Sequence, residues 1–460
     1  MMLLALAWPG FAGAQVQTGV PDTLQLQAGL SGRQSGEWTL EDCIRYALKE
    51  NISLQKSRIN VQTSAVDLKT ARAALFPNLS FSTSQNVVNR PYQETSSTVS
   101  GTEVLYNTSK TSYNGNYGLN AQWTLYNGSK RKKTIEQETL NNRIAQLDAS
   151  ATANSIEESI TQVYVQILYA AEAVNVNRNT LEVSRAQCDR GKQLLEAGSL
   201  SRADYAQLEA QVSSDNYQLV TSEVALQDYK LQLKQLLELD GGEEMSLYLP
   251  QLSDAQVLLP LPDKNEVFNT AMTLRPEIES GKLNVQASEL AIGIARAGFL
   301  PSLSLSAGIG TTNVSGSDYT FAQQVKNGWN NSAGLSLSVP IFSNRQNKSA
   351  VQKAELQHQT SRLDLQETQK ELYKTIEDLW LNANSAQQQY VAATEKLRST
   401  QTSFELVSEQ FNMGMKNTVD LLTEKNNLLS AQQEVLQAKY MAVLNAQLLR
   451  FYQGEEIVIE

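Results

Sequence analysis

Residues 71–80 read ARAALFPNLS, and residues 295–304 read ARAGFLPSLS. After each copy come segments of alternating polar and apolar residues, and then a long segment free of glycine and proline. Each copy closes with a glycine, five further residues and an aspartate. Repetition of a whole pattern in the same order indicates a duplicated structural unit. Few architectures combine a strand pair with one very long helix, so the repeat restricts the fold strongly.

The duplication divides the chain into segments. The linker between the copies contains Pro250, Pro260 and Pro262 and follows neither the strand pattern nor the helix pattern. Together with residues 15–40 and the C-terminal tail, it is expected to form a belt around the middle of the molecule. The predicted divisions are a signal peptide at 1–14, a first unit at 15–237, a linker at 238–276, a second unit at 277–450 and a tail at 451–460.

The signal peptide is predicted from the N-terminal residues. Residues 1–14 are largely apolar and end in Ala12-Gly13-Ala14. A short apolar run before a small-x-small cleavage pattern is typical of secretory signals. We therefore expect export of the chain across the inner membrane of a bacterium.

Two very long helices are predicted, over 130–197 and 347–412. Apolar residues recur at alternating intervals of three and four in both segments, which is the heptad pattern of coiled coils. No proline occurs in residues 92–249 or 341–460, and an interior proline destabilises a helix by about 3 kcal/mol. Shifting the first seam by 216 residues superposes it on the second. At 1.5 Å per residue, such a helix extends roughly 100 Å.

Each long helix is expected to end in a tight turn. Gly198 and Gly414 stand at the ends of the two seams, and glycine suits the position after a helix C-terminus. Asp204 and Asp420 follow at the start of the next apolar stripe, where an acidic side chain favours a helix start. We therefore predict return helices over 204–237 and 419–450.

Four segments alternate with a period of two, over 78–88, 117–126, 302–311 and 333–342. One face of each is apolar, and the other carries small polar residues with almost no charge. Strands of about ten residues can span a bilayer when tilted, so we interpret them as membrane-spanning, with surface loops at 89–116 and 311–332. The prolines assigned to strand starts are Pro77, Pro301 and Pro340.

A sheet in hydrocarbon must close on itself, because a lipid-exposed edge leaves backbone groups without partners. Four strands are too few to close alone. Three chains would supply twelve, so the duplication predicts a homotrimer. The predicted fold is a membrane protein dominated by α-helices, with a trimeric twelve-stranded β-barrel continuous with a long helical barrel.

Composition narrows the functional classes. The formal net charge is −10, and the only basic cluster is Lys130-Arg131-Lys132-Lys133, so nucleic acid is not an expected partner. We interpret this run as a solvated helix start, with a membrane interface as the alternative. The single histidine, His358, has no second ligand at metal spacing. No catalytic triad, P-loop or dinucleotide fingerprint appears, so neither enzyme activity nor a cofactor is expected.

In several sequence features, the chain resembles the TolC-like outer-membrane efflux family over nearly its whole length. These features are the duplicated Ala-Arg-Ala-x-x-x-Pro, the two Gly-x5-Asp turns, and the segment 123–128 paired with 338–343. The resemblance implies a trimeric barrel in the outer-membrane lipid and a helical tunnel through the periplasm. It also implies docking to a periplasmic adaptor and to an inner-membrane pump or ABC exporter.

The resemblance also implies a periplasmic entrance at the second turn. Asp420 matches an aspartate that lines the narrowest ring, while Lys416 and Phe411 match a basic and an aromatic residue that hold the entrance closed. Asp204 matches the acceptor of that latch. Thr423 stands where some family members carry a second ring aspartate. The alternative for the charged residues is ordinary helix capping and solvated charge.

Two functional classes remain open at this point. An export channel accounts for the paired strands and the long helices together. A trimeric coiled-coil surface protein without a transport role would account for the seams but gives no reason for amphipathic strands. Within the export class, the residues do not distinguish drug or metal efflux from protein secretion by a type I system.

Overall fold

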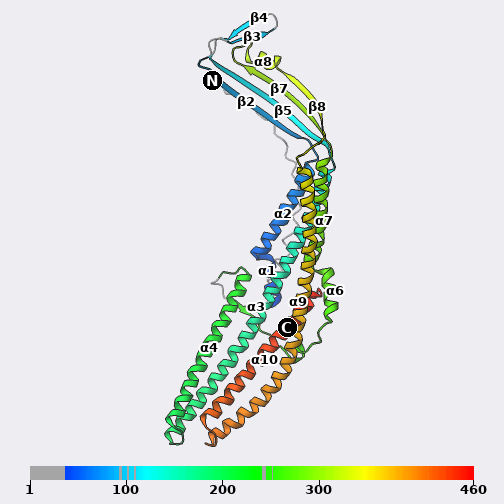
Figure 1. The fold of residues 1–460 in the computed structure, drawn as a ribbon. Helices are drawn as coiled ribbons and strands as arrows, with labels where there is room; N and C mark the ends of the chain where they lie inside the picture. The colour runs from blue at the N-terminus through cyan, green and yellow to red at the C-terminus, as the bar shows by residue number, and fades with distance from the viewer. Residues whose placement is uncertain are drawn as a thin grey trace.

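The computed structural model describes residues 37–92, 96–100, 103–107, 110–240, 245–250 and 252–459. The predicted signal peptide at 1–14 lies outside the described residues. The chain is elongated, with a sheet at one end and long helices running away from it to two hairpin turns at the other (Figure 1). Among the described residues, no helix is long and apolar enough to cross a membrane.

A four-stranded sheet forms the upper end. It consists of β2 (Asn78–Asn89), β5 (Thr111–Asn127), β7 (Ser302–Val314) and β8 (Asn330–Ser338) in the order β2-β5-β7-β8, with every pair antiparallel. The central pair, β5 and β7, joins the two copies of the unit. Among the described strands, β2 and β8 each have a partner on one side only. The sheet is therefore open, with one edge from each copy.

The register puts like residues side by side across the sheet. Ala121 of β5 pairs with Leu79 of β2 and with Ala307 of β7, which pairs in turn with Ala333 of β8. The adjacent row, one residue along each strand, consists of glycine and small polar residues: Asn120 of β5 pairs with Ser80 of β2 and with Gly308 of β7. Because neighbouring residues on a strand face opposite sides, the sheet has one apolar face and one polar face, as the sequence predicted.

Several details of the strand predictions are wrong. The last strand ends at Ser338, short of the predicted 342, so Pro340 follows a strand instead of leading into one. Proline has no N–H to donate to a strand ladder, which explains the early end. The segments predicted as loops contain a hairpin of β3 (Ser96–Ser100) and β4 (Glu103–Asn107), the first residues of β5, and the short helix α8 (Phe321–Asn327).

Pro77 and Pro301 stand directly before β2 and β7. At the first of these junctions, the end of helix α2 (Ile52–Ala73) is held by side chains from the strand–helix connection. The Trp123 Nε1–H donates to the Leu75 carbonyl at 2.8 Å, and the Arg131 guanidinium donates to the Ala74 carbonyl at 2.8 Å and to Thr124. These bonds tie the strands rigidly to the helices beneath them.

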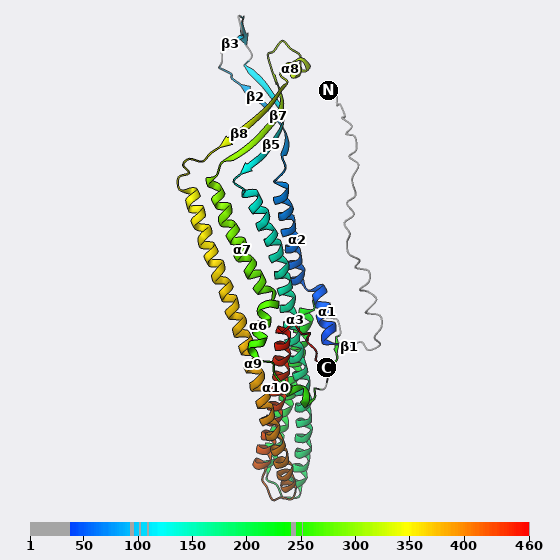
Figure 2. The ribbon, with the colours of Figure 1, turned by 90° about the vertical axis from the view of Figure 1, so that its right-hand side faces the viewer.

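The helices below the sheet repeat with the spacing seen in the sequence. Helix α3 (Lys130–Glu196) and helix α9 (Gln346–Asn412) are offset by 216 residues at both ends, and so are α4 (Arg202–Leu236) and α10 (Thr418–Tyr452). The upper part of the rod consists of α2, α3, α7 (Pro276–Arg296) and α9, lying side by side (Figure 2). A short 3₁₀ turn (Ala297–Phe299) follows α7.

The predicted heptad seams are buried in the lower rod. Ile160, Ile167 and Val174 of α3 are buried, and so are Ile376, Ala383 and Tyr390 of α9. Towards the tip, the seam residues Cys188, Phe404 and Val407 are half-buried. The seams therefore hold each hairpin together, as a coiled coil does.

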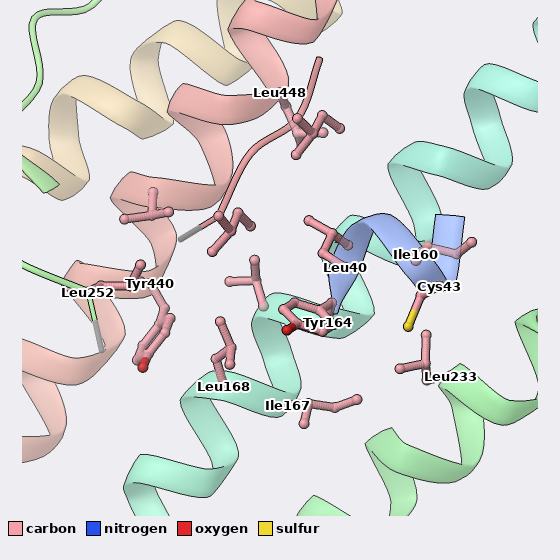
Figure 3. Close-up of a cluster of buried hydrophobic side chains, with 14 of the residues drawn as sticks. Leu40, Cys43, Ile160, Tyr164, Ile167, Leu168, Leu233, Leu252, Tyr440 and Leu448 are labelled. Atoms are coloured by element: carbon pink, nitrogen blue, oxygen red, sulfur yellow. The ribbon is translucent and has the colours of Figure 1, made fainter. Parts of the chain in front are cut away.

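The largest core lies midway along the rod, where the segments outside the two hairpins gather. It includes α1 (Leu40–Glu50), β1 (Glu37–Trp38), β6 (Ser246–Leu247), α5 (Asp254–Val257) and the tail residues Ile457 and Ile459. Tyr164 of α3 lies at its centre beside Leu40 and Leu168 (Figure 3). Its hydroxyl donates to the Tyr248 carbonyl at 2.5 Å. The belt segments thus complete a core that the long helices could not close alone.

A buried cation fastens this region to the upper rod. Arg275, which follows α6 (Lys264–Leu274) and caps α7, is 8% exposed. Its guanidinium contacts Glu158 of α3 and Glu277 of α7, both at 2.9 Å, and lies 4.2 Å from the centre of the Tyr452 ring of α10. One side chain therefore connects three helices.

Candidate functional site: the helical tip

The two turns at the tip have the same backbone geometry. Gly198 and Gly414 adopt φ values of +73° and +75°, the left-handed region that favours glycine. After them, the N–H of Ser199 donates to the Leu194 carbonyl at 2.8 Å, and that of Met415 donates to the Gln410 carbonyl at 2.9 Å. Both glycines therefore close a long helix in the way the sequence predicts.

The two aspartates lie in the first turns of the return helices. The Ser201 hydroxyl accepts a hydrogen bond from the Asp204 N–H at 3.1 Å, and the Asn417 side chain accepts one from the Asp420 N–H at 2.8 Å. Asp204 and Asp420 thus hold equivalent positions one turn from the end of the molecule. Thr423, one turn further along α10, donates its hydroxyl to the Val419 carbonyl.

The basic residue of the second turn pairs locally. Lys416 Nζ lies 3.4 Å from Asp420 Oδ2, and both side chains are about two-fifths exposed, 42% and 41%. Within the described chain, no ion pair joins Lys416 to Asp204. An exposed pair of this kind contributes little to stability, so both groups remain available to a neighbouring molecule.

Phe411 forms the core of the tip. Its ring is buried against Leu208 of α4 and Leu421 of α10, so that it joins the hairpin of α3 and α4 to the hairpin of α9 and α10. Gly191 of α3 leaves room for the Leu208 side chain, because a Cβ atom at position 191 would lie 2.4 Å from Leu208 Cδ1. The hairpins are thus packed together at the tip within one chain.

Sequence reasoning missed a buried polar network above this core. Lys425 of α10 is 3% exposed and contacts Asp215 of α4, which is 4% exposed, and Ser184 of α3. The Ser184 hydroxyl donates to Asp215, and the Gln211 amide donates to the other carboxylate oxygen at 2.9 Å. Burial lowers the pKa of the Lys425 ammonium, which the attraction of Asp215 opposes.

The network exists once in each chain because the two copies differ here. With the 216-residue offset, Asp215 corresponds to Ala431, which is buried, and Lys425 corresponds to Glu209. A signal was present in the sequence: Asp215 lies between Val212 and Leu219 on the apolar stripe, and Lys425 lies between Leu422 and Leu429. Two opposite charges at interior heptad positions indicate a buried pair.

Comparison with known proteins identifies the family. Residues 43–238 and 267–455 match the family model described as "Outer membrane efflux protein". The chain belongs to the outer membrane efflux protein family. The matched residues take in both copies of the unit, with their strands, long helices and tip turns.

Relatives within the outer membrane efflux protein family share limited sequence identity. "Alkaline protease secretion protein AprF" of Pseudomonas aeruginosa is 25% identical over 64% of this chain and 60% of its own length. "Outer membrane efflux protein BepC" of Brucella suis is 21% identical over 90% of this chain and 85% of its own length. The crystal structure of the CmeC outer membrane channel of Campylobacter jejuni has a TM-score of 0.76 at 20% identity, covering 92% of this chain and 87% of CmeC.

Family membership confirms the resemblance seen in the sequence. It places the protein in the outer membrane, as an efflux channel whose helical part lies in the periplasm. It also decides against the structural alternative, a coiled-coil surface protein without transport. The fold of strands above and long helices below is the fold of solved channels of this family.

Proposed function

We propose that the protein is a homotrimeric, passive conduit of a tripartite efflux or export system, gated at the helical tip. The observation that supports the trimer is the open sheet. Strands β2 and β8 form its two edges, and the strands have an apolar face. Leu79 and Leu337, near the lower ends of these strands, are 70% and 65% exposed. Three chains joined edge to edge make a closed barrel of twelve strands and leave no edge in lipid.

The polar face of the sheet supports a water-filled passage through this barrel. Asn120 and Asn116 donate side-chain hydrogen bonds to Ser82 and Ser84 across neighbouring strands, at 3.4 and 3.2 Å. Such a face is hydrated and uncharged, so it passes solutes without binding them tightly. The conduit needs no catalysis of its own, and the energy for export is assigned to an inner-membrane pump or ABC exporter.

A periplasmic adaptor is the second proposed partner. The tip hairpins extend the chain furthest from the membrane, so an adaptor that joins pump and channel reaches them first. AprF is named for protease secretion and BepC for efflux, so both kinds of export occur among relatives. We assign this protein to the efflux and export class as a whole, without choosing between efflux and protein secretion.

The entrance is proposed to be a ring of Asp420 and Asp204 side chains from three chains. Asp420→Ala is expected to reduce the cation preference of single channels in planar bilayers, because it removes three negative charges from the narrowest point. Lys416→Ala should increase that preference, since Lys416 lies 3.4 Å from Asp420 and offsets its charge. Unchanged conductance and selectivity in Asp420→Ala would count against the ring.

Lys416 and Phe411 are proposed to hold the entrance closed at rest, with Asp204 of a neighbouring chain as the acceptor for Lys416. The double variant Phe411→Ala with Lys416→Ala removes a buried ring from the tip core and a charge from its rim. Cells carrying it should become sensitive to large antibiotics that the wild-type channel excludes. Exclusion equal to wild type, with normal amounts of protein in the membrane, would refute the latch.

A further inference from the structure

The junction between strands and helices is strongly basic in an otherwise acidic chain. The four segments that cross it, residues 68–80, 127–135, 290–304 and 338–354, contain no Asp or Glu. We define the basic collar as the cations at the end of α2 and the starts of α3 and α9, leaving out Arg131, whose guanidinium donates to the Ala74 and Thr124 carbonyls. Its members are Arg72, Lys130, Lys132, Lys133, Arg345 and Lys348.

Helix stability does not explain the collar. The N-terminus of a helix carries a partial positive charge, which favours acidic residues in the first turn. Helices α4, α6, α7 and α10 follow this rule. Helices α2, α3, α8 and α9 have no acidic residue in the first turn, and of these four only α3 and α9, which begin at the junction, carry lysine there. Lys130 and Lys348 thus add positive charge to helix ends that are already positive. This placement lowers helix stability, and an anionic partner would offset the loss.

The collar also lacks partners within the chain. Collar residues form no ion pair in the part of the chain that the structure describes, although ion pairs occur along the rest of the rod. All except Lys133 are exposed. Six unpaired cations at one level create a potential that attracts anions.

A hollow of about 550 Å³ lies beside the collar, between α3, α7 and α9. Its wall combines Lys133, the Glu289 carboxylate, and Arg296, which pairs with Glu355 at 3.0 Å, with apolar side chains, among them Leu140 and Ile292. Gly293 lets Lys133 lie against α7, because a Cβ atom at position 293 would be 2.4 Å from Lys133 Nζ. Cations over an apolar wall suit a ligand with an anionic head and an apolar body.

The collar lies at the level of a membrane surface. Phe76, Ile341 and Phe342, in the same junction segments, are 73%, 96% and 84% exposed. Exposed apolar and aromatic residues between an apolar strand face and a row of lysines and arginines mark the boundary between hydrocarbon and headgroups. The phosphates of the periplasmic leaflet would therefore meet the collar.

We propose that the basic collar and the hollow beside it bind the phosphate headgroups of anionic phospholipids in the periplasmic leaflet of the outer membrane. The binding fixes the depth and tilt of the barrel relative to the long rod. It depends on insertion of the strands in the membrane and is independent of the gate at the tip.

The test is native mass spectrometry of the detergent-solubilised protein titrated with phosphatidylglycerol or phosphatidylcholine. Wild type should retain phosphatidylglycerol in preference. The variant Lys130→Gln, Lys132→Gln, Lys133→Gln should bind it more weakly by on the order of a hundredfold, since each lysine near an anionic surface contributes about a factor of five. The matched control Lys192→Gln, Lys230→Gln, Lys374→Gln, which removes equal charge from the rod, should bind as wild type does.

Further comparisons separate lipid binding from folding and from the binding of free anions. Replacing the three collar lysines with arginine should restore lipid retention, and the glutamine variant should keep the wild-type mass and single-channel conductance. Equal retention of both lipids by wild type, or full retention of phosphatidylglycerol by the glutamine variant, would overturn the proposal. So would displacement of phosphatidylglycerol by inorganic phosphate alone at millimolar concentration, because the site would then recognise a free anion.

Discussion

Lys425→Met is expected to open the periplasmic tip to large antibiotics and to lower the thermal unfolding temperature of the protein. The substitution removes the cation that pairs with Asp215 and leaves the carboxylate buried between α3, α4 and α10. Removing one partner of a buried pair costs about 3–5 kcal/mol, because the remaining charge loses its compensation. This cost falls at the point where the two tip hairpins are joined.

A control variant distinguishes the effect of losing this buried pair from the effect of losing an exposed ion pair. Lys396 and Glu434 join α9 to α10 at 2.7 Å, but their side chains are 47% and 45% exposed. Lys396→Met should therefore change stability by less than about 1 kcal/mol and leave antibiotic exclusion intact. The double variant Asp215→Leu with Lys425→Leu replaces the pair by apolar contacts and should recover most of the lost stability. Wild-type melting and exclusion in Lys425→Met would show that the pair does not hold the tip.

Arg275→Met is expected to have the second large effect, a loss of about 3–5 kcal/mol in the middle of the rod. The variant leaves Glu158 and Glu277 without their shared cation and removes the stacking of the guanidinium on Tyr452. Thermal unfolding followed by circular dichroism measures the loss. Arg178→Met, which removes an ion pair whose side chains are 50% and 48% exposed, is the matched control and should cost less than about 1 kcal/mol.

The Arg275→Met penalty should depend on pH. Burial raises the pKa of Glu158 above its ordinary value, and Arg275 opposes the shift. A carboxyl with a raised pKa in the folded state binds its proton more tightly when folded, so its contribution to stability grows as the pH falls through that pKa. Without Arg275 the pKa rises further, and the penalty should shrink at acidic pH. A penalty that is equal at pH 5 and pH 8 would contradict this explanation.

Periodicity predicted the parts of the fold that depend on repeated contacts. The seams through Ile160 and Ile376 are buried as expected, because a heptad pattern leaves one helix face to be covered. The glycines of the tip turns were predictable from conformation alone, since φ values near +75° exclude most other residues. The two faces of the sheet, one apolar and one polar, followed from the alternation of apolar and small polar residues.

Features that depend on single contacts were not predictable in the same way. The end of β8 at Ser338 is set by Pro340, although the apolar alternation continues to Ile341. The pair of Asp215 and Lys425 joins residues 210 positions apart, so their proximity depends on how two hairpins pack. Each residue alone reads as a solvated charge on a helix. Residues that interrupt an apolar stripe therefore merit as much attention as the stripe itself.

The most direct test of the proposed channel is the mass of the unheated protein, purified from membranes in detergent and measured by native mass spectrometry. The proposed twelve-stranded barrel takes three copies of the chain of 50.8 kDa, less any signal peptide removed on export, because each chain supplies four strands. We predict a trimer that is lost on heating. A stable monomer in the same detergent, before any heating, would contradict the proposed channel.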